Sequence, residues 1–339
     1  MMKTRLVLKE NLINMSNDNI RAFDIRMDMD AMIDLIEAAF AGELENWGGD
    51  FRERMKMAKQ MVPLLSILSR ISKTFQHVFD GFVWEEQGRI VSMVNVQKTG
   101  LDTKRWLIGN VATHPDYQRR GFARKLVTRA MQHAQEHGAE ICTLDVRTEA
   151  TPAYNLYRSL GFVHYDSIAA LKLEVLPQTQ AKPILGYTVR PMKLSEWQAR
   201  YVLALQETPE DVQAFLPVRK VDFRISPIEY VITPLAQCIQ KMRVHRWAVE
   251  MDGQLAGNML LVASKKANIH HELNFRIEPS HRQALAESLL TLALDTLQAY
   301  PKHILRTEIR TSYKDLLDLF KRYGFVEIED NHRLGAKFN

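Results

Sequence analysis

The chain has 339 residues, of which 46% are hydrophobic and 25% are charged, and its formal net charge is +5. This composition is typical of a globular protein and excludes a chain that is mainly disordered. At about 150 residues per domain, the length predicts two domains, each long enough to bury a core. The small positive excess permits an anionic ligand but does not indicate nucleic acid as a partner.

The cysteines and the longest apolar stretch indicate the compartment. Cys142 and Cys238 are too few for a disulfide framework or a cysteine-based zinc site, so we expect buried, reduced residues. Residues 1–19 lack the apolar run of a signal peptide. The stretch 61–69 is interrupted by Pro63 and is far shorter than the roughly 20 residues of a membrane span. The sequence therefore predicts a cytoplasmic protein with no membrane partner.

From residue 20 onward the hydropathy pattern alternates between strand-like and helix-like segments. A short strand, a helix and a helical region with a Met-rich face are followed by a hairpin and a strand that a proline ends. An amphipathic helix, a strand, a short helix and a last strand complete the series. In chain order the predicted segments are 22–26, 32–40, 41–78, 81–85 with 90–97, 106–113, 121–137, 141–146, 152–159 and 163–175.

The same order of elements begins again after a polar stretch with two prolines, which predicts a linker. Pro115 corresponds to Pro279, and Gly161 corresponds to Gly324, at almost the same spacing. The repetition indicates two copies of one mixed α/β unit. The second series is 186–191, 247–250 with 255–262, 273–277, 284–299, 304–309 and 316–320. The predicted division is a tail over 1–19, a first domain over 20–176, a linker over 177–185 and a second domain over 186–339.

The run 111–124 is the most informative, because a strand leads through a basic, glycine-containing loop into a helix. A helix N-terminus has unpaired backbone N–H groups and a partial positive charge. Gly121 lets a ligand approach the backbone, and Arg119, Arg120 and Arg124 add positive charge. The segment favours an anion, most naturally a diphosphate. The residues alone leave open an ordinary strand–helix turn with solvated arginines.

Two motifs of the first copy resemble the signatures of the GNAT family of N-acetyltransferases. The run 118–123, Gln-Arg-Arg-Gly-Phe-Ala, is similar to the Gln/Arg-x-x-Gly-x-Gly/Ala acyl-CoA signature. The run 144–162 resembles the second signature, a strand and short helix that end in Leu-Tyr-x-x-x-Gly-Phe. The resemblance covers about residues 20–176 and is visible only in outline in 186–339. It implies two tandem GNAT-like α/β folds, each a mixed, twisted sheet flanked by helices.

The resemblance implies acetyl-CoA as cosubstrate and no metal. In the family the strand before the loop splays from its neighbour at a bulge, where pantetheine binds, and the following backbone amides hold the pyrophosphate. This chain departs from the family pattern at Ala150, where an asparagine is frequent. Carried over residue by residue, the cofactor-binding positions are Val111, Ala112, Thr113, Gln118, Arg119, Arg120, Gly121, Phe122, Ala123 and Arg124.

The resemblance also implies direct attack of a primary amine on the thioester through a tetrahedral intermediate. The backbone N–H of Val111 would stabilise the oxyanion, and Tyr157 would protonate the leaving thiolate. The amine must be neutral, and an alkyl amine has a pKa of about 10, so a base is expected. Asp145 and Glu149 are the candidates. Each carboxylate could instead be a surface group, and Tyr157 could be a core aromatic.

The second copy has lost these functional side chains. An apolar side chain would fill the diphosphate space, a carboxylate would repel phosphate, and a phenylalanine has no proton to donate. At the positions of Arg120, Gly121, Ala123 and Tyr157 it has Ala284, Leu285, Glu287 and Phe320. We therefore predict a structural or substrate-recruiting domain that does not bind acetyl-CoA well.

Weaker signals concern metals, the acceptor and partners. His133, Glu136 and His137 match a zinc-binding pattern without an evident further ligand, so no metal is expected. The Met and Leu stripe over 55–68 indicates core or a lid over the acceptor cleft. The predicted partner is a small-molecule or peptide amine, and the chain is a monomer or homodimer. Two alternatives remain open: a non-catalytic acyl-CoA-binding sensor or scaffold, and an acyltransferase with a longer acyl group or a non-amine acceptor.

Overall fold

The structure is a computed structural model, and it describes residues 19–41, 52, 55, 59, 80–100, 103–182, 184–224, 241–266 and 269–338. The chain forms two compact units, Met1–His164 with Arg333–Asn339, and Tyr165–His332. Cys238, nearly all of the predicted tail and most of the predicted lid lie outside the described residues. No helix of the described ranges is both long and apolar enough to cross a membrane.

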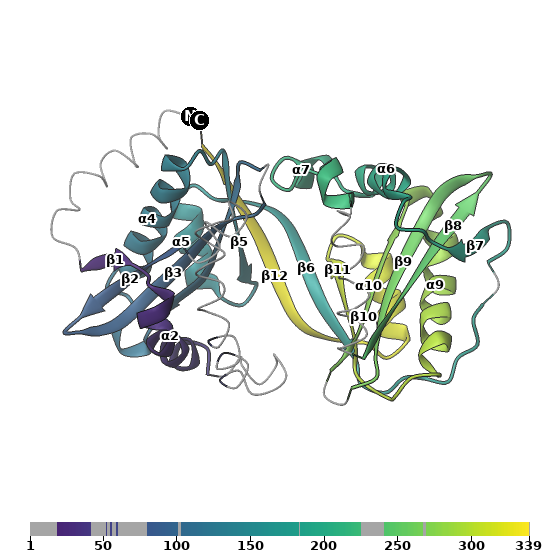
Figure 1. Ribbon diagram of the computed structural model, residues 1–339, viewed down its shortest axis with the longest axis horizontal. Coiled ribbons are helices and arrows are strands. Elements are labelled where there is room, and N and C mark those ends of the chain that lie inside the picture. Colours follow the sequence, from purple (N-terminus) through teal and green to yellow (C-terminus); the bar gives the residue numbers. More distant parts are fainter. Residues whose placement is uncertain are drawn as a thin grey trace. The chain divides into compact units, whose positions relative to one another are not determined.

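The first unit is built on a mixed sheet with the strand order β1-β2-β3-β4-β5-β12 (Figure 1). Successive strands from β1 to β4 pair antiparallel, whereas β4 and β5 pair parallel. The strands are β1 (Ile20–Ala22), β2 (Gly81–Glu86), β3 (Arg89–Lys98), β4 (Arg105–Thr113), β5 (Ile141–Arg147) and β12 (Val326–Lys337).

Helices cover both faces of this sheet because its strands alternate buried side chains between two clusters. The cluster with Phe82 and Trp84 packs against α4, and the cluster with Val83 packs against α2. The helices are α2 (Ile25–Ala39), the 3-10 turn η2 (Pro115–Tyr117), α4 (Phe122–Glu136) and α5 (Thr151–Ser159).

The predicted helix over 121–137 is confirmed, but the predicted first strand over 22–26 is wrong. The strand ends at Ala22, and the helix begins at Ile25. The cause is Asp24, whose carboxylate accepts the backbone N–H of Arg26 at 2.9 Å and caps the helix.

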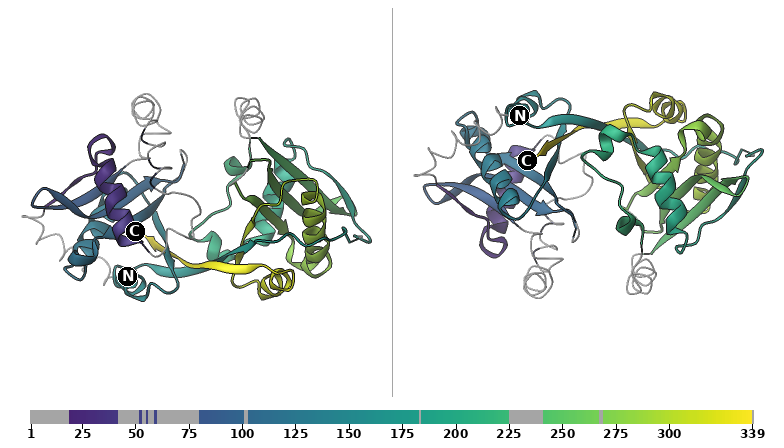
Figure 2. Two further views of the ribbon diagram at one scale, coloured as in Figure 1. Left: turned by 90° about the horizontal axis from the view of Figure 1, so that it is seen from below. Right: turned by 90° about the horizontal axis from the view of Figure 1, so that it is seen from above.

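The second unit has the strand order β12-β6-β11-β10-β9-β8-β7. Helices α9 and α10 contribute to the main buried cluster on one face, and α6 contacts β9 and β10 from the other (Figure 2). Its strands are β6 (Val163–Leu173), β7 (Thr188–Pro191), β8 (Met242–Met251), β9 (Gln254–Ser264), β10 (His271–Ile277) and β11 (Leu305–Arg310). Its helices are α6 (Trp197–Glu207), α7 (Glu210–Gln213), η3 (Lys220–Phe223), η4 (Pro279–His281), α9 (Arg282–Leu297) and α10 (Lys314–Arg322).

Each sheet is completed by a strand from the other half of the chain. Strand β6 follows the first half in sequence but pairs antiparallel with β11 of the second unit. Strand β12 ends beside β5 of the first unit, where Leu334 and Ala336 are buried. The N–H of Phe338 donates to the carbonyl of Glu140 at 2.8 Å. The compact units therefore exchange their last strands and differ from the division 20–176 and 186–339, which follows chain order.

Candidate functional site

Strand β4 contains a bulge in its second half. The pairing of β3 and β4 shifts register between Met93 and Asn95, so that Asn110 and Val111 lie opposite a single residue of β3. Asn110 has φ +48°, a left-handed conformation that is rare outside glycine but tolerated by asparagine. The bulge carries Val111, the residue whose backbone N–H the family resemblance assigns to the oxyanion.

Strands β4 and β5 are paired only at their beginnings. The parallel ladder covers Arg105–Leu107 of β4 and Ile141–Thr143 of β5. In the described structure, residues 108–113 of β4 have no register partner on β5. A strand edge of this kind can bind an extended ligand through backbone hydrogen bonds. Ala112 and Thr113 lie on this edge, where we expected the pantetheine chain.

The buried side chain of Ser92 holds the end of β4 in place. Its hydroxyl donates to the carbonyl of Ala112 at 2.9 Å and lies 2.7 Å from the hydroxyl of Thr113. The N–H of His114 donates to the carbonyl of Val91 at 2.9 Å. These bonds orient the strand immediately before the basic loop, a role for Ser92 that sequence reasoning missed.

The loop between η2 and α4 contains two left-handed residues, Arg119 at φ +62° and Gly121 at φ +85°. Gly121 is the N-cap of α4, and a Cβ added to it would meet no protein atom within 4 Å. Its backbone conformation therefore requires glycine, and the space in front of it is open to a ligand. Gln118 donates from its amide to the carbonyl of Thr113 at 3.4 Å, which ties the loop to β4.

The N-terminal end of α4 has no acidic residue in its first turn, so the positive charges of the nearby arginines and the helix dipole are not offset there. Arg124 donates to the hydroxyl of Ser159 at 2.7 Å. Arg120 donates to the carbonyl of Asp116 at 3.1 Å and lies 4.7 Å from the ring centre of Tyr117. Glu86 approaches Arg120 only to 3.9 Å, so the guanidinium is weakly paired.

The side chains of Phe122 and Ala123 pack against the protein and are not directed at a ligand. Phe122 is buried and stacks on Trp84 with ring centres 4.3 Å apart, and Ala123 is partly buried. Of these two positions, only the backbone N–H groups are suited to an anion at the start of the helix.

Tyr157 is buried on α5 and packs edge-on against Phe162 at 6.1 Å between ring centres. Its hydroxyl makes no hydrogen bond to any side chain or backbone group of the described residues. Burial raises the pKa of Tyr157 well above its ordinary value. The phenol therefore keeps its proton at neutral pH, as a proton donor requires.

The two candidate bases are exposed and ion-paired. Asp145 on β5 lies 3.8 Å from Nε of Arg333, and its side chain is 52% exposed. Glu149 lies 4.0 Å from Arg147, and its side chain is 74% exposed. The contact with Arg333 could not be anticipated, because this arginine belongs to β12 at the far end of the sequence.

The corresponding part of the second unit is built differently. Helix α9 begins three positions after Pro279, whereas α4 begins seven positions after Pro115, so a helix replaces the loop. The β9–β10 ladder runs from Glu272 to Ile277 without a register shift. Of the described residues in this unit, none reproduces the bulge of β4.

The replaced side chains of the second unit are engaged in packing and ion pairs. Leu285 and Phe320 are fully buried in its core. Glu287 lies 2.9 Å from Lys182 and accepts a hydrogen bond from Tyr323 at 2.8 Å. These contacts agree with a unit that has kept its packing, while its inability to bind acetyl-CoA stays a prediction.

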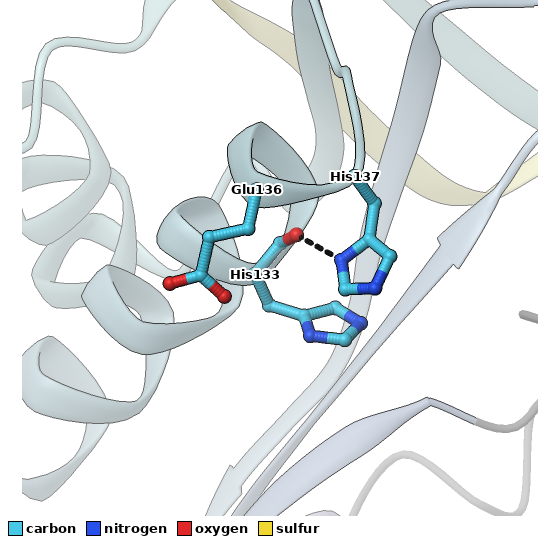
Figure 3. Close-up of side chains that lie close together, drawn as sticks. All are labelled: His133, Glu136 and His137. Carbon is cyan, nitrogen blue, oxygen red and sulfur yellow. Dashed lines mark hydrogen bonds between the residues drawn. The ribbon is translucent and has the colours of Figure 1, made fainter.

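His133, Glu136 and His137 lie together at the end of α4, with their ligand atoms within 4.8 Å of one another (Figure 3). Each is also bonded elsewhere. His133 Nε2 lies 2.7 Å from a carboxylate oxygen of Asp80, His137 Nδ1 lies 2.7 Å from the carbonyl of His133, and Glu136 lies 3.3 Å from Arg129. The contact between His133 and Asp80 joins α4 to the residue before β2, and the expectation of no metal stays a prediction.

Comparison with known sequences supports the family resemblance. Residues 53–162 match the model of the acetyltransferase (GNAT) family. A 53-residue segment is 40% identical to the [ribosomal protein bS18]-alanine N-acetyltransferase of Escherichia coli K12, covering 16% of this chain and 36% of the relative. The Haemophilus ducreyi protein of the same name is 35% identical over 79 residues, which cover 23% of this chain and 52% of the relative. The matches thus span about a third to a half of these relatives.

Two solved structures resemble the chain over nearly its whole length. A tandem GNAT protein from the clavulanic acid biosynthesis pathway has a TM-score of 0.57 at 15% identity, covering 95% of this chain and 98% of that protein. A GCN5-related N-acetyltransferase from Sphaerobacter thermophilus has a TM-score of 0.62 at 13% identity, with 95% and 96% covered. At such identities the likeness is one of fold. Residues 53–162 therefore match the acetyltransferase (GNAT) family, and the chain as a whole has a tandem GNAT fold.

Proposed function

We propose that the first unit transfers an acetyl group from acetyl-CoA to a primary amine. One observation carries the proposal: a single segment holds the bulge at Asn110 and Val111 and, directly after it, the glycine-capped, basic start of α4. The first feature suits a reacting carbonyl, and the second suits a diphosphate. The family match over residues 53–162 supports the same reaction class.

Acetyl-CoA fits the residues present. The open space at Gly121 leaves room for phosphate beside the backbone N–H groups of α4, and Arg119 and Arg124 supply positive charge nearby. The edge of β4 over 108–113 offers backbone groups to the pantetheine amides. The ten cofactor-binding positions expected from the resemblance stay a proposal, with Phe122 and Ala123 contributing through their backbone.

Acetyl-CoA supplies an activated thioester carbonyl. The backbone N–H of Val111 is assigned to the negative charge that develops on the carbonyl oxygen. Tyr157, kept protonated by burial, is assigned to the departing sulfur. Asp145 and Glu149 are assigned to the proton of the attacking amine, directly or through water.

The character of these carboxylates bears on the acceptor. Both are exposed and each is paired with an arginine, so an acceptor that is already partly neutral suits this site. An α-amino group has a pKa of about 7.7–8.0 and is partly neutral near pH 7, whereas a lysine-type amine with a pKa of about 10.4 is not. This difference favours a peptide N-terminus, the acceptor named for the alanine N-acetyltransferase relatives.

The test begins with calorimetric titration of acetyl-CoA into the whole protein. One site per chain is expected, with binding lost in Gly121→Glu. A matched pair of variants separates the ligand from the backbone: Gly121→Ala and Gly138→Ala sit at the two ends of α4, both at positive φ and both with open space. Both should lose stability, and only Gly121→Ala should weaken binding.

Turnover is then assayed on a peptide with a free N-terminal alanine and on the same peptide with a blocked N-terminus and an internal lysine. Faster acetylation of the first peptide is expected. Acetyl-CoA binding without turnover on any amine would favour the sensor or scaffold alternative. Equal loss of binding in both glycine variants would remove the assignment of the diphosphate site.

A further inference from the structure

Three arginines gather on one face of the second unit's sheet. Arg246 lies on β8 and Arg276 on β10, and the pairing of both strands with β9 places them on the same face. Their neighbours Trp247 and Phe275 pack on the opposite face, against the cluster that contains α9. Arg200 comes from α6, the helix that contacts β9 and β10. A helix and two strands thus direct one guanidinium each to one region.

The charges of this arginine cluster (Arg200, Arg246 and Arg276) act on one another. Burial lowers the pKa of Arg200, and the positive charges of Arg246 and Arg276 lower it further. Burial also lowers the pKa of Arg246. Arginine keeps its charge under nearly all conditions, so the protein holds three repelling cations in one region, with Arg200 and Arg246 partly buried and Arg276 exposed.

No carboxylate of the described residues forms an ion pair with the arginine cluster. Partly buried charges are usually paired, and the unit follows this rule elsewhere. Acidic residues on the neighbouring elements have other partners. Glu272, on the same face of β10 as Arg276, lies 3.3 Å from His270, Glu196 and Glu250 both bind Arg190, and Asp222 binds Arg219. Within the described part of the chain, the positive charge of the cluster is therefore not balanced by a paired carboxylate.

Aromatic rings orient the cluster without neutralising it. The guanidinium carbons of Arg200 and Arg276 each lie 5.8 Å from the ring centre of Phe223. Close by, Arg224 lies 4.6 Å from the ring centre of Trp197. A ring attracts a guanidinium without accepting its N–H groups as a carboxylate would, so these donors stay available to an oxyanion. The two rings lie on η3 and α6, and the guanidinium groups near them come from α6, β10 and the residue after η3.

We propose that the arginine cluster of the second unit binds a doubly charged oxyanion, chemically a phosphate monoester. Guanidinium groups bind phosphate oxygens in pairs, and three of them around one group would supply more donors than phosphate has oxygens. The negative charge of the bound ligand would balance the positive charge of the arginine cluster. This site lies on the face covered by α6, away from the start of α9, and does not depend on acetyl transfer in the first unit.

The first measurement is calorimetric titration of inorganic phosphate and of a phosphorylated sugar into the whole protein at low ionic strength. One site per chain is expected, weakened at least tenfold in Arg276→Gln and in Arg200→Gln. Arg322→Gln removes the same charge from α10 and should change binding less than twofold. Absence of saturable phosphate binding, or equal loss in all three variants, would overturn the proposal. Tighter binding of malonate than of phosphate would overturn the phosphate assignment.

Thermal unfolding gives a second readout that a purely structural role would not produce. Without phosphate, Arg276→Gln should unfold at a higher temperature than the unaltered protein, because one repelling charge is gone. With phosphate at saturation, the order should reverse, because only the unaltered protein gains stability from the ligand. A variant that is less stable under both conditions would mean that Arg276 supports packing instead.

Discussion

Nε of Arg333 lies 3.8 Å from Oδ1 of Asp145, although the two residues come from opposite halves of the sequence. Asp145 is one of the two carboxylates assigned to the amine proton, and Arg333 reaches it on the exchanged strand β12. A charged residue of the second half of the chain thus contributes to the proposed chemistry of the first unit.

If Asp145 takes up the amine proton, Asp145→Asn should lower kcat by roughly 100-fold, the usual scale of a lost general base. Binding of acetyl-CoA, measured by calorimetry, should not change. Glu149→Gln is the matched comparison, because it removes the same charge from the other exposed, ion-paired carboxylate. Equal activity of Asp145→Asn and the unaltered protein would leave Glu149 or water as the acceptor.

Tyr157→Phe should bind acetyl-CoA normally and turn over at least 100-fold more slowly, because only the proton of the hydroxyl is lost. Tyr154→Phe on the same helix is the control and should stay active. Burial raises the pKa of Tyr157, so kcat should not fall between pH 8 and 10 through loss of its proton. A fall in that range that disappears in Tyr157→Phe would contradict the raised pKa, whereas unchanged turnover in Tyr157→Phe would contradict the assignment of Tyr157 as proton donor.

The side chain of Asn110, at the bulge of β4, donates a hydrogen bond to the side chain of Asn95 at 3.0 Å. Asn110→Gly should keep the bulge and the binding of acetyl-CoA. Asn110→Val should cost about 1–2 kcal/mol of unfolding free energy, because a β-branched residue is disfavoured at positive φ, and should weaken binding. Gln87→Val, at φ +50° in the β2–β3 turn, should lose stability and bind normally. Loss of binding in both valine variants would mean that binding follows stability alone.

Stability of the second unit should fall in mild acid because of His271. This fully buried side chain accepts the N–H of Ser264 on Nδ1 at 3.0 Å and donates from Nε2 to the carbonyl of Pro301 at 3.0 Å. Burial lowers the pKa of His271 below its ordinary value, with a smaller contribution from neighbouring histidines. The imidazole of His271 is therefore protonated near pH 6.5 in the unfolded chain but stays neutral at that pH in the folded chain.

The contribution of His271 is therefore complete above about pH 6.5 and is lost as pH falls toward the lowered folded value. Urea unfolding at pH 8 and pH 5.5 should show the loss. It should persist in His270→Gln, where the replaced ring is partly exposed, and shrink in His271→Gln. If His271→Gln does not fold, the hydrogen-exchange protection factor of the Ser264 amide in the unaltered protein should still fall on acidification. An unchanged protection factor would contradict the prediction.

Much of the first unit was predictable because local signals and the fold agree. The hydrophobic stripe of α4 and the glycine before it follow from spacing and backbone conformation. The bulge also has a local signal, since Gly109 and Asn110 are both unusual inside a strand. The strand predicted over 22–26 was wrong because a cap, Asp24, outweighed the apolar pattern.

The exchange of strands was beyond sequence reasoning. Strand β12 alternates only over its first four residues and then continues through the polar run 330–333, so it was not predicted. Even a correct strand assignment would not have told which sheet it joins, because β6 and β12 come from equivalent positions of the two copies. The pairing of Asp145 with Arg333 and the arginine cluster of the second unit depend on such long-range packing.

The exchanged strands also make the two halves of this chain interdependent for folding. A fragment that stops before residue 333 would leave β5 as an open edge without Leu334 and Ala336, and such edges promote aggregation. Cleavage within 177–185 should produce a nicked protein that remains associated on a sizing column and separates only in denaturant. Each of the two pieces should be insoluble alone, and they should fold when mixed. The two repeated halves would then behave as complementing fragments that a linker joins in one chain.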